Sequence, residues 1–177
     1  AGSPQSWSTS DDGTLRFCGG DWTVSLDFES SNLTVVGDDG FERPVIRGGG
    51  VTNQVNLLKS GATVWLENLE FTEGNNCWGS VVRAVNAEDL VIEKGGTEIV
   101  VEDCGMEHES VSVDLTLQDV WIYGNYFPEE HDLGGGMLGV TESLVTLNNT
   151  VISDNLGHGI VAFNSDVICN GDSGTEA

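Results

Sequence analysis

Residues 134–171 read GGGMLGVTESLVTLNNTVISDNLGHGIVAFNSDVICNG, and this stretch carries one pattern twice. Short runs of alternating apolar and polar residues are separated by Asn, Asp and Gly instead of by helix-forming residues. Alternation with a period of two residues is typical of a β-strand that buries one face. The stretch therefore predicts a succession of short strands joined by tight turns.

Part of this stretch also occurs upstream, as an internal repeat. Residues 145–155 (VTLNNTVISDN) align without a gap with 115–125 (LTLQDVWIYGN) and with 64–74 (VWLENLEFTEG). A second run matches 159–166 with 136–143 and, more loosely, with 80–87, which predicts at least two strand faces in each repeat. The first alignment places four sets of residues in common columns: Leu66, Leu117 and Leu147; Asn68, Asp119 and Asn149; Phe71, Ile122 and Ile152; and Gly74, Asn125 and Asn155.

The spacing of the repeat predicts the architecture. Leu117 and Leu147 are 30 residues apart, and Leu66 and Leu117 are 51 apart, which we interpret as two turns with a degenerate coil at 89–103 between them. Periods of about 20 to 50 residues are typical of solenoids, propellers and arrays, whose units bury their apolar faces by stacking. With period-2 strands, the prediction is an all-β solenoid of about six coils.

The same segments resemble a known class of proteins. Residues 33–40 (LTVVGDDG), 44–50 (PVIRGGG) and 55–74, followed by the two later blocks, resemble right-handed parallel β-helix domains. These are the pectin-lyase-like fold and the related repeat passengers of bacterial surface proteins and adhesins. The resemblance covers roughly 17–171 and implies a right-handed parallel β-helix. Lyases, hydrolases, adhesins and filament proteins share this coil, so the resemblance does not imply one function.

Composition and charge exclude some classes of function. The 177 residues suffice for one domain, and no apolar run approaches the ~20 residues that span a bilayer. Twenty-nine acidic and six basic residues give a formal net charge of −23, which repels nucleic acids and anionic membranes. An acidic exterior fits an extracellular or cell-surface protein. Calcium collection is one reading of this charge, although no specific motif supports it, and solubility alone is the other.

The domain organisation is predicted as a tether or cap at 1–22, a β-helix at 23–171 and a polar tail at 172–177. Residues 127–133 are interpreted as an acidic insertion in the 30-residue coil. A solenoid needs polar caps, and the residues after Cys169 are too few to form one. We therefore expect neighbouring domains of a longer surface protein, or a second copy that stacks head to tail and extends into a filament.

The four cysteines divide into two pairs. Cys77 and Cys104 are 27 residues apart, close to one coil, so they are predicted to lie about 4.8 Å apart on successive coils and to form an intramolecular disulfide. Cys18 and Cys169 are some six coils apart, roughly 29 Å, and cannot bridge within a straight stack. They are free thiols, or meet through a non-solenoidal end, or pair between molecules. Four cysteines favour an oxidising compartment.

Enzymatic chemistry of the resembling families finds little support in the sequence. Gly157-His158-Gly159 is similar to the Gly-His-Gly of polygalacturonase-type hydrolases. Those enzymes also carry an Asn-Thr-Asp and a basic Arg-Ile-Lys, whereas here Asn149-Thr150 is followed by Val151 and no Lys or Arg follows Lys94. Without cations an anionic sugar is poorly held, so His158 is assigned to a turn before a strand at 160–163. The lyase mechanism needs an arginine base beside calcium carboxylates; Arg83 is the arginine to test, and is expected to be an ordinary surface charge. We predict no catalytic residues, and a polysaccharide lyase or hydrolase is the alternative.

Aromatic residues are the candidate ligand surface. Inward Leu66 places Trp65 outward, and inward Ile122 places Trp121 and Tyr123 outward. Exposed rings can stack on sugar rings or pack against a partner, unless neighbouring loops cover them. The column of Asn68, Asp119 and Asn149 is expected to make structural turn hydrogen bonds. Asn32 and Asn148 begin glycosylation sequons, whose use depends on the host.

The predicted function is a secreted or cell-surface structural or adhesive module without enzymatic activity or cofactor, which stacks head to tail in one version of the hypothesis. Its expected partners are itself, neighbouring domains or a polysaccharide. The alternative is a carbohydrate-active enzyme or polysaccharide-binding module of the same fold.

Overall fold

The computed structural model describes residues 5–38, 40, 42–50, 53–87, 90–94, 97–101, 108–126 and 136–171. Every regular element in these ranges is a β-strand. The all-β prediction is therefore confirmed for the described part of the chain, which also holds no helix that could cross a membrane.

Six strands form a sheet in which every neighbouring pair is parallel. They lie in the order of the chain, so each pass adds one strand to the edge of the previous one. The strands are β2 (Gly13–Phe17), β4 (Asn32–Gly37), β7 (Ala62–Glu67), β13 (Val113–Gln118), β16 (Leu144–Asn148) and β19 (Asp166–Asn170).

A second, 11-stranded sheet bends at β3 (Asp21–Phe28) into two wings. The start of β3 pairs with the first wing and its end pairs with the second. The first wing contains β5 (Val45–Arg47), β8 (Glu70–Thr72), β14 (Trp121–Tyr123) and β17 (Val151–Ser153). The second contains β6 (Val55–Leu57), β9 (Val82–Ala87), β15 (Gly136–Thr141) and β18 (His158–Phe163), with β1 (Gln5–Thr9) on β3 and β12 (His108–Ser110) on β9.

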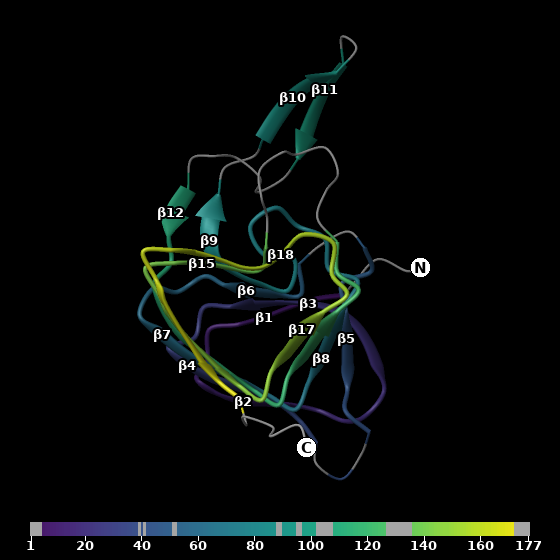
Figure 1. Ribbon diagram of the computed structural model, residues 1–177, viewed down its shortest axis with the longest axis vertical. Helices are drawn as coiled ribbons and strands as arrows, with labels where there is room; N and C mark the ends of the chain where they lie inside the picture. Colours follow the sequence, from purple (N-terminus) through teal and green to yellow (C-terminus); the bar gives the residue numbers. More distant parts are fainter. Residues whose placement is uncertain are drawn as a thin grey trace, which may run out of the picture.

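The chain visits the six-stranded sheet, the first wing and the second wing in the same order, again and again. Four such passes are β4-β5-β6, β7-β8-β9, β13-β14-β15 and β16-β17-β18. Figure 1 shows the passes lying over one another on three sides of a common interior. The structure is thus a set of parallel strands curled around one core, compatible with a solenoid.

The repeat columns are neighbouring residues of this core. Leu117 pairs with Leu66 on one side and with Leu147 on the other, and Ile122 pairs in the same way with Phe71 and Ile152. Leu66 and Leu117 have no exposed surface, and Leu147 is 8% exposed. The predicted common interior column is therefore confirmed. The largest fully buried side chains are Leu26, Phe28, Ile46, Leu57, Leu66, Leu69, Phe71, Leu115, Leu117, Ile122, Met137 and Leu138.

The predicted degenerate coil between Leu66 and Leu117 is wrong. Strand β13 pairs directly with β7, so no coil lies between them. The intervening residues contain an antiparallel hairpin of β10 (Leu90–Lys94) and β11 (Thr97–Val101), which forms its own sheet. Figure 1 shows this hairpin projecting from the body. A spacing near twice the repeat fits an insertion as well as a divergent coil, and the sequence did not distinguish them.

The turns that lead from the six-stranded sheet into the first wing contain the aligned polar residues Asn68, Asp119 and Asn149. Asn68, Asp119 and Asn149 have positive φ angles of 52°, 54° and 47°, the left-handed region that Asn and Asp tolerate better than other non-glycine residues. The Asn149 amide donates to the Asp119 carboxylate, and the Asn68 amide donates to the Gly37 carbonyl at 3.3 Å. These hydrogen bonds between passes confirm the predicted structural role.

The paired strands begin earlier than residue 23, where the β-helix was expected to begin. Strand β1 pairs with β3, and β2 pairs with β4, so part of the segment assigned to a tether or cap lies within the sheets. At the other edge, all five residues of β19 are exposed. The predictions for the insertion at 127–133, for Cys104 and for the tail at 172–177 fall outside the described residues.

Candidate functional site

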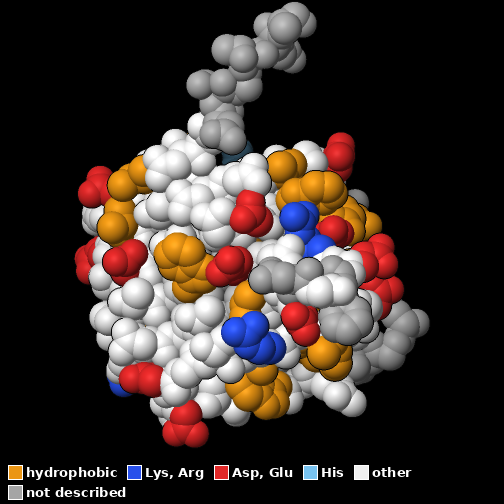
Figure 2. Space-filling view, turned by 90° about the horizontal axis from the view of Figure 1, so that it is seen from below, with side chains coloured by type: hydrophobic (Ala, Val, Ile, Leu, Met, Phe, Trp, Pro, Cys, Tyr) orange, Lys and Arg blue, Asp and Glu red, His pale blue; other side chains and the backbone are white. Residues whose placement is uncertain are grey.

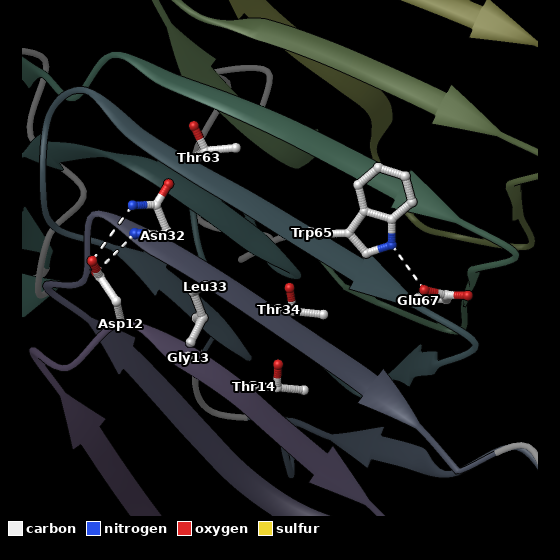
Figure 3. A pocket seen from close by; sticks show the side chains of 9 residues that line it. All are labelled: Asp12, Gly13, Thr14, Asn32, Leu33, Thr34, Thr63, Trp65 and Glu67. Atoms are coloured by element: carbon white, nitrogen blue, oxygen red, sulfur yellow. Dashed lines mark hydrogen bonds between the residues drawn. The ribbon is translucent and has the colours of Figure 1, made fainter.

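An open groove lies on the outer face of the six-stranded sheet, across β2, β4 and β7 (Figure 3). Its volume is about 700 Å³. We call it the Trp65 groove. It is lined by Asp12, Gly13, Thr14, Asn32, Leu33, Thr34, Thr63, Trp65 and Glu67.

Strand alternation places Trp65 in this groove. Its neighbours Val64 and Leu66 are buried, while Trp65 is 38% exposed, so the predicted outward orientation is confirmed. The register aligns Thr14, Thr34 and Trp65 across the three strands. Because adjacent strands lie about 4.8 Å apart, two hydroxyl-bearing side chains follow the indole ring in a row along the groove.

The indole ring is held by a residue on the same face of its strand. The Trp65 Nε1–H donates to Glu67 Oε2 at 3.0 Å, as Figure 3 shows. Side chains two residues apart in a strand lie on the same face of the sheet, so β7 itself places Glu67 beside Trp65. The hydrogen bond limits the orientations of the ring and keeps a carboxylate beside it.

A second carboxylate stands at the other end of the groove. Asp12 Oδ1 accepts hydrogen bonds from the backbone N–H groups of Ser31 and Asn32 at 2.7 and 2.9 Å, and the Asn32 amide donates to Oδ2 at 3.4 Å. These bonds, the backbone N–H of Asn32 first, hold the pKa of Asp12 below its usual value. Asp12 is therefore an anion at neutral pH.

The groove combines an aromatic ring with hydroxyls, an amide and two carboxylates. Such a set suits a ligand that has both an apolar face and many hydroxyl groups, because the ring packs on the face and the polar groups accept and donate hydrogen bonds. None of the nine residues that line the groove is Lys or Arg. An anionic ligand would therefore meet carboxylates without a compensating cation in the lining.

A smaller cavity of about 330 Å³ lies on the outer face of the first wing. Trp121 is 46% exposed and Tyr123 is half-buried, and both point outward on β14 as the alternation predicts. We call this cavity the Trp121–Tyr123 pocket. It is lined by Glu70, Trp121, Ile122, Tyr123, Val151, Ser153 and Asp154.

Neighbouring side chains fix both rings of this pocket. The Tyr123 hydroxyl donates to Glu70 Oε2 at 2.9 Å, and burial together with this carboxylate raises the pKa of Tyr123. The Arg43 guanidinium carbon lies 4.7 Å from the centre of the Trp121 ring, while Arg43 Nε donates to Asn68 Oδ1 at 3.1 Å. The alternative for these rings was that neighbouring loops cover them. Arg43 does contact the Trp121 ring, but Trp121 stays substantially exposed.

The two residues considered for catalysis, Arg83 and His158, lie on β9 and β18, with β15 between these strands. His158 is exposed at the start of β18, so this strand begins two residues earlier than expected. Within the described ranges, no three His, Cys, Asp or Glu side chains gather in a way that could hold a metal ion.

The expectation that Arg83 is a surface charge is wrong. Arg83 is 6% exposed, and its Nε donates to Asn56 Oδ1 at 2.8 Å. It does point to the outer face of the second wing, in the column that continues to Gly139. The backbone of Trp78 and Gly79 packs against Gly139, so the outer face of this wing is covered there.

The cysteines differ in state. Cys77 is disulfide-bonded, while its predicted partner Cys104 lies outside the described residues. The argument from coil length for this pairing does not hold, because the segment between β9 and β13 is no coil. Cys18 and Cys169 are exposed free thiols within the single chain.

Sequence reasoning found the aromatic residues of both cavities and missed their polar neighbours. Asp12, Thr14 and Asn32 precede the first block of the repeat alignment, so they had no column. Extending the register by two strands would have placed Thr14 and Thr34 beside Trp65. Asp12 gave no signal, because its role depends on a turn between β1 and β2.

Comparisons with protein-family models, with curated proteins and with solved structures found no match for this chain.

Proposed function

We propose that this protein is a secreted or cell-surface structural and adhesive module, built as a right-handed parallel β-helix. The fixed order in which the chain visits three parallel strand layers supports the β-helix, as does the continuous column of Leu66, Leu117 and Leu147. A stack of this kind presents long, flat outer faces, and repeat proteins commonly use such surfaces for binding.

The Trp65 groove is the proposed adhesive site, and its ligand is a neutral polysaccharide. One observation carries this proposal: an exposed indole, oriented by Glu67, stands in a groove whose other polar side chains are hydroxyls, an amide and a carboxylate. A pyranose ring offers an apolar face to the indole and hydroxyls to the polar groups. A chain with a net charge of −23 and no cation in the groove disfavours polymers of uronic acids.

Affinity electrophoresis and calorimetry with neutral and acidic polysaccharides test this function. We expect binding to a neutral polymer such as a glucan, mannan or xylan, and none to polygalacturonate. Trp65→Ala should reduce the affinity at least about tenfold, roughly the loss of one stacking contact and its buried area. Trp121→Ala is the matched control, because it removes an exposed indole from another face.

Two results would contradict the proposal. Equal polysaccharide binding by Trp65→Ala and the unmodified protein would exclude the groove as the site. Release of reducing or unsaturated sugars during the assay would favour the alternative, a carbohydrate-active enzyme.

Head-to-tail assembly is a second proposal, favoured by the edge strands of the six-stranded sheet. Among the strands that the structure describes, β2 and β19 are the outermost of this sheet, and such parallel edges can pair with a further copy. Pairing in the register of the existing column would place Cys169 beside Leu15 of the next copy, about 10 Å along the strand from Cys18. Bridged Cα atoms lie within about 7 Å, so an in-register filament would hold no Cys18–Cys169 disulfide.

Negative-stain microscopy with and without reductant tests the assembly. Fibres that persist in reductant, and in a Cys18→Ser/Cys169→Ser variant, are expected. A monomer at all concentrations, or fibres that need the cysteines, would contradict in-register stacking.

A further inference from the structure

We propose that the Trp121–Tyr123 pocket binds the cationic side chain of a basic polypeptide, an arginine or a lysine. This site is separate from the Trp65 groove, because the two cavities lie on different sheets and share no lining residue. The proposal therefore stands or fails independently of polysaccharide binding.

The chemistry of the pocket matches an organic cation. Trp121 and Tyr123 supply two aromatic rings, whose faces carry partial negative charge, and the carboxylates of Glu70 and Asp154 line the same cavity. Val151, which is 46% exposed, supplies apolar surface for the aliphatic stem of the side chain. A cavity of about 330 Å³ has room for one such side chain.

The protein already places a cation on this ring. The Arg43 guanidinium lies 4.7 Å from the centre of the Trp121 ring, within the range of a cation–π contact. Arg43 does not line the pocket, so the cavity lies beside the existing contact and is not filled by it. Trp121 thus accepts a guanidinium within this fold, and the pocket offers further ring surface together with carboxylates.

The other charges around the pocket favour binding of a cationic ligand. Arg47 is the arginine that acts on Tyr123, and it is bound to Glu73 at 2.6 Å and to Asp21 at 3.3 Å. On the face in Figure 2, Lys and Arg side chains likewise lie close to acidic ones. The net charge of −23 adds a long-range attraction for basic partners.

Hydrogen-bond acceptors distinguish a basic side chain from a quaternary ammonium ion. Glu70, Ser153 and Asp154 present carboxylate and hydroxyl oxygens at the pocket. Arginine and lysine carry N–H donors for these oxygens, whereas a quaternary ammonium carries none. A side chain with donors should therefore bind more tightly than choline.

Nuclear magnetic resonance titration of the full chain tests the proposal, with a blocked Gly-Gly-Arg-Gly-Gly peptide as the probe. We expect saturable shifts of the Trp121 indole N–H and the Tyr123 amide, and no saturable shift of the Trp65 indole. The same peptide with citrulline, a neutral isostere of arginine, should not bind. Choline should bind at least about tenfold more weakly than the arginine peptide.

Variants assign the effect to the pocket. Trp121→Leu should weaken peptide binding at least about tenfold, and Asp154→Asn about threefold. Asp114→Asn is the matched control, since it removes one exposed carboxylate from the outer face of the six-stranded sheet. Binding of citrulline or choline with the affinity of arginine would overturn the proposal, as would equal losses for Asp154→Asn and Asp114→Asn. The peptide controls use the unmodified protein and do not depend on the folding of any variant.

Discussion

Leu66 and Leu117 face each other across paired strands, although 51 residues separate them along the chain. Strands β7 and β13 are parallel and place these two residues in register, and neither has exposed surface. Each leucine therefore buries its side chain against the preceding and following passes of the chain. The stability of the domain should depend on this column more than on any contact within one pass.

Replacing Leu117 by Ala should test this dependence. The substitution removes a fully buried side chain whose neighbours above and below are also leucines, so we expect a loss of about 2–5 kcal/mol in the free energy of unfolding. Denaturant unfolding followed by circular dichroism measures this loss. Leu144→Ala, at an exposed position of the adjacent strand β16, should cost less than about 1 kcal/mol. Similar losses for both variants would contradict the interior column.

The left-handed turn position leads to a second prediction, at Asn149. Asn149→Ala should lower the free energy of unfolding by about 2 kcal/mol, because alanine is strained at a φ of 47° and the hydrogen bond to Asp119 is lost. Asn149→Gly loses the same hydrogen bond but accepts the backbone angle, so it should be about 1 kcal/mol more stable than the alanine variant.

A comparison of thermal and denaturant unfolding of the two Asn149 variants measures this difference. If alanine proves as stable as glycine, backbone conformation is not the reason for asparagine at this turn.

The columns of the core were predictable because stacking repeats them. The same residue type recurs wherever the register places it in the interior or at a left-handed turn, and the alignment of three blocks found Leu66, Leu117, Leu147 and the turn residues. Period-2 alternation then placed Trp65 and Trp121 outside. These predictions required only local pattern and one repeated spacing.

The features that interrupt the repeat were not predictable in this way. The β10–β11 hairpin fills a spacing that a divergent coil would fill equally well. Arg83 does point away from the core, but the segment at Trp78 and Gly79 covers that face, and no periodic signal announces a covering loop. Asp12 reaches the Trp65 groove from the turn between β1 and β2, which lies ahead of the three aligned blocks.

The covered face gives a third prediction, at Gly139. A β-carbon at this position would coincide with the carbonyl oxygen of Trp78, a backbone atom that moves only with its whole segment. Gly139→Ala should therefore destabilise the protein by at least about 3 kcal/mol, or prevent folding. Gly40→Ala is the matched control, because nothing lies within 4 Å of a β-carbon there.

Soluble yield and unfolding midpoint of the two glycine variants provide the measurement. A Gly139→Ala protein with the midpoint of the Gly40→Ala protein would mean that the segment at Trp78 does not pack on β15.

The Asp12 carboxylate gives a prediction about pH. Hydrogen bonds from backbone N–H groups, that of Asn32 first, lower its pKa in the folded protein. A folded-state pKa below the unfolded value means that this carboxylate stabilises the fold above its unfolded pKa of about 3.9. The contribution is lost as the pH falls through the folded pKa.

Carbon-detected titration of the Asp12 carboxyl group should give a pKa below the ordinary value of an aspartate side chain. Asp12→Asn should lower stability at neutral pH and remove this group's share of the acid dependence, because the amide oxygen accepts hydrogen bonds without a charge. Asp12→Asn changes one side chain of the Trp65 groove and leaves Trp65 and Glu67 in place. We therefore expect polysaccharide binding to weaken without disappearing. An Asp12 with the ordinary pKa of an aspartate side chain would show that the backbone N–H groups of Ser31 and Asn32 do not stabilise its charge.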